Sequence, residues 1–263
     1  MSKNDEIRNL INEYLKKNKI ISFPEEHLAY DGIIGDDDRV ELLYLLKETT
    51  STGFKRYLED YDSKGTKKNK REKTYREEYP DEFLEYLEQK DAIWDFIKTT
   101  NRIIKYPETR FEKVWPILAY WTEAHKDVNK KFSECISKYE LNDVKDIDYS
   151  ILSNTAIVNI KKTSGKSISE DEILKNAVKH YGDLIKKEIE IIDPRIVMCC
   201  GTFEYAKTIY NADIIEDLYC GAKFFKRQIK DKEVYFIEFV HPSCRVTKAA
   251  TFAYAKAVFM ELD

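Results

Sequence analysis

Polar residues that could do chemistry lie at, or directly after, the ends of short apolar segments of the chain. Glu48 follows the first such segment, Asn159 lies near the end of the second, Gly201-Thr202 follows the third and His241 follows the last. A carboxylate can stabilise a positively charged transition state or orient water, and a histidine can donate a hydrogen bond to a departing anion. A side-chain amide donates and accepts together, which suits it to binding a polar ligand that has a donor beside an acceptor. These residue types could form one site if the fold brings them to the same edge of a sheet.

Each of these residues also has a purely structural explanation. Glu48 could be a helix cap or a solvated loop acid, and Asn159 could hydrogen-bond a neighbouring turn. His241 precedes Pro242 and could simply occupy a structured turn. Gly201 is needed in any case wherever a strand turns tightly into a helix. Only their joint placement therefore favours a functional site.

The apolar segments themselves are predicted to be buried β-strands, because they are short, bounded and apolar on both faces. Strands are expected at 40–46, 155–160 and 195–200, followed by a pair of strands at 223–229 and 233–240. Helices are expected near 7–15, over 169–185 and over 247–260. Alternating strands and helices indicate an α/β fold. We expect three α/β/α layers with a central, mainly parallel four-stranded sheet, whose strands place the polar residues at their carboxyl ends.

The chain is expected to form a single α/β domain over 1–263, with a helical and basic insertion at 54–130 after the first strand. Lysine and arginine are concentrated between Lys64 and Lys73. This segment could be a solvated loop or an arm that contacts phosphates. The tryptophans of the helical part are expected in packed positions, and they are Trp94, Trp115 and Trp121.

Composition limits the classes of protein that this chain can belong to. The formal net charge is -4, and no apolar run reaches the roughly 18 residues of a membrane span. The start of the chain lacks the pattern of a secretory signal, and the 5 cysteines are irregularly spaced. We therefore expect a cytoplasmic protein with reduced thiols, no membrane association, no metal site and no cofactor. We also expect a monomer.

Four segments resemble the uracil-DNA glycosylase superfamily. His241-Pro242-Ser243, directly after an apolar strand, is similar to the family's second signature motif, which begins His-Pro-Ser and precedes the last helix. The segment 192–202 resembles the family's helix, proline, strand and glycine, and 156–159 resembles the strand whose terminal asparagine reads the base. The segment 46–50 stands where the family carries its first motif. The resemblance covers about 40–51 and 150–263, and it does not cover 54–130.

The resemblance implies a monofunctional DNA glycosylase that hydrolyses the N-glycosidic bond of a flipped uracil or modified pyrimidine and leaves an abasic site. It implies Glu48 and His241 as the catalytic residues, Asn159 as a reader of the base, and Phe54, in competition with Tyr57, as its stacking partner. The residues expected to contact DNA phosphates are Ser243, Arg245, Lys161 and Thr202. Lys47 and Thr50 stand where the family's first motif has glycine and proline. This difference is compatible with a substrate other than plain uracil.

Three other functions remain open from the sequence. The same fold could be a non-catalytic module that binds nucleic acid, and this is the main alternative. The chain could also be an unrelated α/β hydrolase that acts on nucleotides or small glycosides. Finally, Lys47 keeps open a lyase reaction through a Schiff base.

Overall fold

The structure is a computed structural model that describes residues 2–18, 29–35, 39–47, 94–95, 114–139, 149–162 and 171–262. Every structural statement below concerns these ranges. Most of the expected insertion at 54–130 lies outside them, and so do Glu48, Phe54 and Tyr57.

One mixed sheet organises the described residues. Its strands, in spatial order, are β2 (Gly32–Ile33), β5 (Thr155–Asn159), β3 (Leu42–Leu46), β6 (Ile196–Cys200), β9 (Lys232–Phe239), β8 (Lys223–Ile229) and β7 (Glu216–Asp217). The four strands in the middle, from β5 to β9, are mutually parallel. At one edge β2 is antiparallel to β5, and at the other edge β8 and β7 continue the sheet in antiparallel fashion. The α/β class is thus confirmed, whereas the expectation of a four-stranded sheet is wrong, since this sheet has seven strands.

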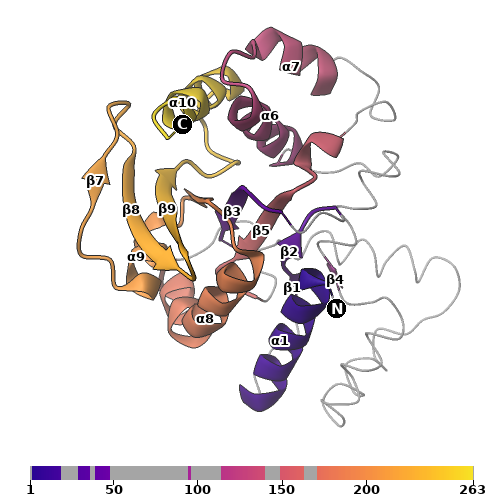
Figure 1. Cartoon of the computed structure of the whole chain (residues 1–263), viewed down its shortest axis with the longest axis vertical. Coiled ribbons are helices and arrows are strands. Elements are labelled where there is room, and N and C mark those ends of the chain that lie inside the picture. Colours follow the sequence, from indigo (N-terminus) through magenta and orange to yellow (C-terminus); the bar gives the residue numbers. More distant parts are fainter. Residues whose placement is uncertain are drawn as a thin grey trace, which may run out of the picture.

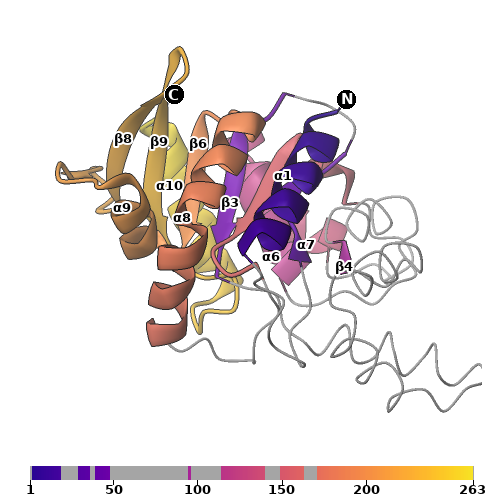
Figure 2. The same cartoon turned by 90° about the horizontal axis from the view of Figure 1, so that it is seen from below.

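Helices cover both faces of the sheet (Figures 1 and 2). One face carries α1 (Lys3–Asn18), α8 (Asp171–Ile192) and α9 (Phe203–Tyr210), and the other carries α6 (Val114–Lys126), α7 (Phe132–Tyr139) and α10 (Lys248–Met260). The strands between them are apolar on both faces because alternate side chains enter two separate cores. In β3, Leu43 and Leu45 belong to the core under α8, whereas Tyr44 and Leu46 belong to the core under α6.

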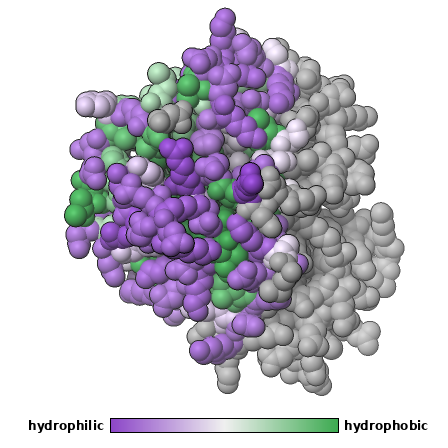
Figure 3. Space-filling view, viewed as in Figure 1, coloured by the Kyte–Doolittle hydropathy of each residue, from purple (hydrophilic) through white to green (hydrophobic). Residues whose placement is uncertain are grey.

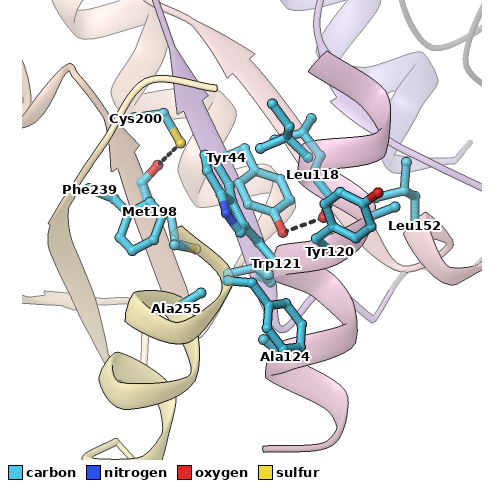
Figure 4. Packing of buried hydrophobic residues seen from close by; sticks show 14 of the residues in the cluster. Tyr44, Leu118, Tyr120, Trp121, Ala124, Leu152, Met198, Cys200, Phe239 and Ala255 are labelled. Atoms are coloured by element: carbon cyan, nitrogen blue, oxygen red, sulfur yellow. Dashed lines mark hydrogen bonds between the residues drawn. The ribbon is translucent and has the colours of Figure 1, made fainter. Parts of the chain in front are cut away.

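The core under α6 is rich in aromatic residues (Figure 4). The ring of Trp121 lies 4.8 Å from that of Phe239 and 6.2 Å from that of Tyr44, measured between centroids. The Tyr44 hydroxyl donates to the carbonyl of Leu118 at 3.2 Å and also contacts Thr122 Oγ1 at 2.8 Å. Trp121 and Trp115 are both buried, as expected. The helix α6, which begins inside the segment 54–130, is therefore part of the layer that covers the sheet.

The second half of the chain follows the predicted pattern closely. β5, β6, β8, β9 and α10 lie where strands and a final helix are expected, within about two residues at each end. The predicted helix over 169–185 corresponds to α8, which continues to Ile192, and Pro194 follows it. A short 3₁₀ helix at Ser150–Leu152 precedes β5.

The short strands are the elements that the sequence does not reveal. β2 and β7 both lie outside the segments that are predicted to be strands. A further parallel pair, β1 (Ala29–Tyr30) with β4 (Trp94–Asp95), forms a separate two-stranded sheet. Strands of two residues are too short to show a period of two, so only their pairing defines them.

The described surface on the side seen in Figure 1 is mainly hydrophilic (Figure 3). Most large apolar side chains lie in the two cores, and the large apolar side chains that stay exposed are those of Ile173, Ile214, Tyr219, Val246 and Met260. No helix of the described ranges is both long enough and apolar enough to cross a lipid bilayer.

Candidate functional site

The carboxyl ends of β3, β6 and β9 bring Lys47, Gly201 and His241 together. Lys47 directly follows β3, Gly201 directly follows β6, and His241 comes two residues after β9. A Cβ atom placed on Gly201 would lie 3.3 Å from Cε of Lys47 and 3.4 Å from Cβ of His241. The two side chains therefore pack against the same glycine. This edge of the sheet is where open α/β folds bind ligands.

Gly201 and Thr202 form the turn from β6 into α9. Gly201 has a φ of 68°, in the left-handed region that favours glycine, and its N–H donates to the carbonyl of Phe239 at 2.8 Å. The Thr202 hydroxyl donates to the carbonyl of Leu45 at 2.7 Å, and its side chain is fully buried. Thr202 was expected to contact DNA phosphate, but here its hydroxyl ties the start of α9 to β3.

His241 is held as a neutral imidazole with one defined donor. The backbone N–H of Ser243 donates to Nδ1 of His241 at 3.1 Å, so Nδ1 acts as the acceptor. In a neutral imidazole the proton then resides on Nε2, which becomes the donor. Burial, and secondarily the positive charge of Lys47, lower the pKa of His241 to about 4. At neutral pH this histidine can therefore donate a hydrogen bond without carrying a charge.

An acidic group on α8 completes the surroundings of Lys47. The carboxylate of Asp171, at the start of α8, accepts hydrogen bonds from Tyr205 at 2.5 Å and from Lys175 at 2.6 Å. The hydrogen bond from Lys175 is the main cause that lowers the pKa of Asp171, and the charge of Lys47 also contributes. The charge of Lys47 therefore acts on both groups: it lowers the pKa of His241 and the pKa of Asp171. No pattern in the sequence distinguishes Asp171 or Tyr205 from other surface residues.

Asn159 is bound to an aspartate that the sequence did not single out. It lies at the end of β5, opposite Leu46 of β3 in the parallel register, and only 1% of it is exposed. Its side-chain Nδ2 donates to Oδ1 of Asp31 at 2.6 Å, and its backbone N–H donates to Oδ2 at 2.7 Å. Asp31 directly precedes β2, the strand that pairs with β5.

A buried lysine holds Asp31 in place. Nζ of Lys162 lies 2.5 Å from Oδ2 of Asp31 and also donates to Glu188 of α8. The Lys162 and Glu188 side chains are fully buried, as is that of Asp31. Burial alone lowers the pKa of Lys162, but the two carboxylates outweigh it and raise that pKa. Burial raises the pKa of Glu188 to about 7 despite the opposing charge of Lys162.

The other expected site residues are placed as follows. Ser243 and Arg245 are exposed in the segment that follows His241. Lys161 is largely buried, and its backbone N–H donates to the carbonyl of Lys47 at 2.9 Å. Glu48 and Phe54 lie outside the described residues.

Within the described ranges, no group of three or more histidine, cysteine, aspartate or glutamate side chains is arranged to hold a metal ion.

Comparisons with known proteins do not assign the chain to a family. No family model matches the chain, and a search of curated proteins finds no match either. What the protein does must therefore be inferred from the site itself.

Proposed function

We propose that this protein is a DNA glycosylase that hydrolyses the N-glycosidic bond of a flipped uracil or modified pyrimidine and leaves an abasic site. The observation that supports this most is the neutral His241 beside Lys47 at the carboxyl edge of the parallel strands: its Nδ1 accepts from Ser243, which leaves Nε2–H as the donor of the ring. A base that leaves the sugar takes the bonding electrons with it and becomes an anion. A fixed donor and a nearby positive charge are the groups that stabilise such an anion.

In this proposal water attacks C1′ of the sugar, the C1′–N bond breaks, and the departing base takes up a proton. His241 donates its hydrogen bond to a carbonyl oxygen of the base as negative charge develops there. Glu48 stabilises the positively charged sugar or orients the water, a division of roles shared with glycoside hydrolysis. Because Nε2 donates without giving up its proton, a histidine pKa of about 4 suits this role.

The remaining groups bind DNA. Asn159 reads the edge of the flipped base and Phe54 stacks on its face. Ser243 and Arg245, which are exposed in the segment after His241, contact backbone phosphates. We further propose that the protein acts as a cytoplasmic monomer that needs no cofactor.

The experiment that tests the function uses oligonucleotides that carry uracil or one of several modified pyrimidines, in single-stranded and double-stranded form. After incubation with the protein, hot alkali cleaves the strand wherever a base has been released. We expect cleavage for at least one base, at the position of that base alone. Intact strands for every base would overturn the enzymatic proposal. Retained DNA affinity in that case would favour a non-catalytic binding module.

The position of Lys47 beside His241 favours a second candidate activity, a lyase reaction. The amine of Lys47 would attack C1′ and displace the base, and cleavage of the C1′–O4′ bond would then open the sugar to a Schiff base. Loss of a C2′ proton from that Schiff base would expel the 3′ phosphate by β-elimination. Borohydride reduces a Schiff base to a stable amine, so it would trap a covalent protein–DNA complex. A Lys47→Gln variant should not form this complex. If borohydride traps no complex with the wild-type protein, the reaction is hydrolysis alone.

A further inference from the structure

The side-chain amide of Asn159 has one defined orientation, because its partner can only accept hydrogen bonds. Asp31 receives three donors: the Asn159 backbone N–H, Asn159 Nδ2 and Lys162 Nζ. Both carboxylate oxygens of Asp31 act as acceptors in these bonds, so the NH₂ group of Asn159, and not its oxygen, faces Asp31. Lys162 reinforces this arrangement, since its ammonium is held between Asp31 and Glu188 and keeps a positive charge against the aspartate.

This orientation leaves Oδ1 of Asn159 without a hydrogen-bond partner among the described residues, although the atom is buried. A buried acceptor with no partner costs about 1–3 kcal/mol, and native proteins contain few of them. Asn159 also lies at the carboxyl end of β5, next to the strand that leads to Lys47. An unpartnered acceptor in this place points to a ligand that supplies the missing donor.

We propose that Asp31 is a positioning residue that turns the amide of Asn159 so that Oδ1 accepts a hydrogen bond from the N3–H of the base. This inference rests on the proposed glycosylase function and narrows its substrate class. The base is a pyrimidine with hydrogen on N3, as in uracil and its 5-substituted derivatives. In a pyrimidine without hydrogen on N3, the N3 lone pair would face the lone pairs of Oδ1. Two acceptors repel each other, so such a base should bind poorly.

The first test compares two bases in the same oligonucleotide: uracil, which has hydrogen on N3, and pyrimidin-2-one, which has a bare N3. The ratio of kcat/KM for the two bases is measured for the wild type and for Asp31→Asn. An amide at position 31 can donate as well as accept, so the Asn159 amide is no longer held in one orientation. We expect the preference for uracil to fall by about tenfold or more in the variant. Dividing the wild-type ratio by the ratio of the variant cancels the intrinsic difference in reactivity between the two leaving groups.

A matched control is Asp183→Asn, the same chemical change on an exposed residue of α8. It should leave the preference within about twofold of the wild type. An unchanged preference in Asp31→Asn, with base release intact, would show that Asp31 does not position the amide.

The second test does not need catalysis. In protein with ¹⁵N-labelled asparagine side chains, one Nδ2 proton of wild-type Asn159 should exchange slowly with water and resonate downfield, because it is bonded to a carboxylate. Adding free uracil should shift the Asn159 amide signal, and adding pyrimidin-2-one should shift it far less. Rapid exchange of both protons in the wild type would overturn the inference, even if Asp31→Asn fails to fold. If the wild type releases no base but shows the protected amide and responds to uracil, the glycosylase proposal fails and the positioning role stands.

Discussion

Lys47 and His241 pack against the same residue, Gly201, and the charge of the lysine is one of the two causes that lower the pKa of the histidine. The other, larger cause is burial. The protein thus keeps a neutral donor beside a lysine side chain. In the proposed reaction the histidine provides a directed hydrogen bond, while the lysine provides the charge that the departing anion needs.

His241→Ala should reduce the rate of base release by about 100- to 1000-fold, the usual cost of removing one donor to a developing anion. DNA affinity, measured by fluorescence anisotropy, should change little, because the donor acts mainly on the transition state. His180→Ala, on an exposed part of α8, is the control and should retain the wild-type rate. Equal rates for His241→Ala and the wild type would remove His241 from the mechanism.

Lys47→Gln should raise the pKa of His241 from about 4 toward its usual value near 6.5, because it removes a positive charge that opposes protonation. Only part of the shift should be recovered, since burial remains and is the larger cause. The imidazole C–H signals followed by NMR between pH 3 and pH 8 measure this directly. Lys207→Gln, which changes a half-buried lysine on α9 that pairs with Glu204, should leave the titration unaltered. An identical titration in Lys47→Gln would mean that the two side chains do not interact.

Gly201→Ala should destabilise the fold by about 1–2 kcal/mol, because φ is 68° at this position and the new methyl group would press against Lys47 and His241. Base release should fall as well, since both side chains are displaced. The control is Gly182→Ala inside α8, where the added Cβ would lie at an ordinary 3.7 Å from Cγ1 of Ile209. That change should stabilise the helix by up to about 1 kcal/mol. Urea unfolding compares the two, and a stable, active Gly201→Ala would contradict the described turn.

Glu188→Gln should change how stability depends on pH. The pKa of Glu188 is raised from 4.5 to about 7, so between these values the folded state binds a proton that the unfolded state releases. The stabilisation that this group contributes is complete below about pH 4.5 and is lost as the pH rises to about 7. Glutamine does not titrate, so the Glu188→Gln variant does not lose stability in this way. The difference in free energy of unfolding, variant minus wild type, should therefore increase from pH 4.5 to pH 7.5.

Glu190→Gln on the same helix is the matched control for that experiment, because Glu190 is exposed. Its stability should run parallel to that of the wild type over the same range. Parallel curves for Glu188→Gln as well would show that Glu188 titrates normally, and hence that it is not buried beside Lys162 and Asp31.

The sequence predicted the parallel strands and the last helix because burial on both faces leaves a nearly continuous apolar segment, as in Leu42–Leu46 and Ile196–Cys200. It also placed Gly201 and His241 at strand ends, and the structure brings them together with Lys47. The edge strand β2 could not be predicted, since two residues carry no period. Because β2 was not predicted, the position of Asp31, which directly precedes that strand, could not be predicted either.

The buried ion pairs were harder to predict, since each member looks like a solvated surface charge when read alone. Lys162 follows Lys161 in a polar segment, and no pattern distinguishes the two. Glu188 did leave a signal: it follows Leu184 and Ile185 at helical spacing and precedes Ile189 and Ile192, so it lies on the apolar stripe of α8. A charged residue on such a stripe needs a buried partner. The sequence alone did not show that Lys162 and Asp31 would provide it.

The place of β3 in the sheet has a consequence for how the protein is made. β3 lies between β5 and β6, both of which come much later in the chain. While the ribosome is still synthesising the middle of the protein, Leu42–Leu46 has neither neighbour, although all five residues are buried in the finished fold. The nascent chain therefore carries an unpaired apolar strand for most of its synthesis, a species prone to aggregate. We expect C-terminal truncations that end before Ile196 to accumulate in inclusion bodies or on chaperones.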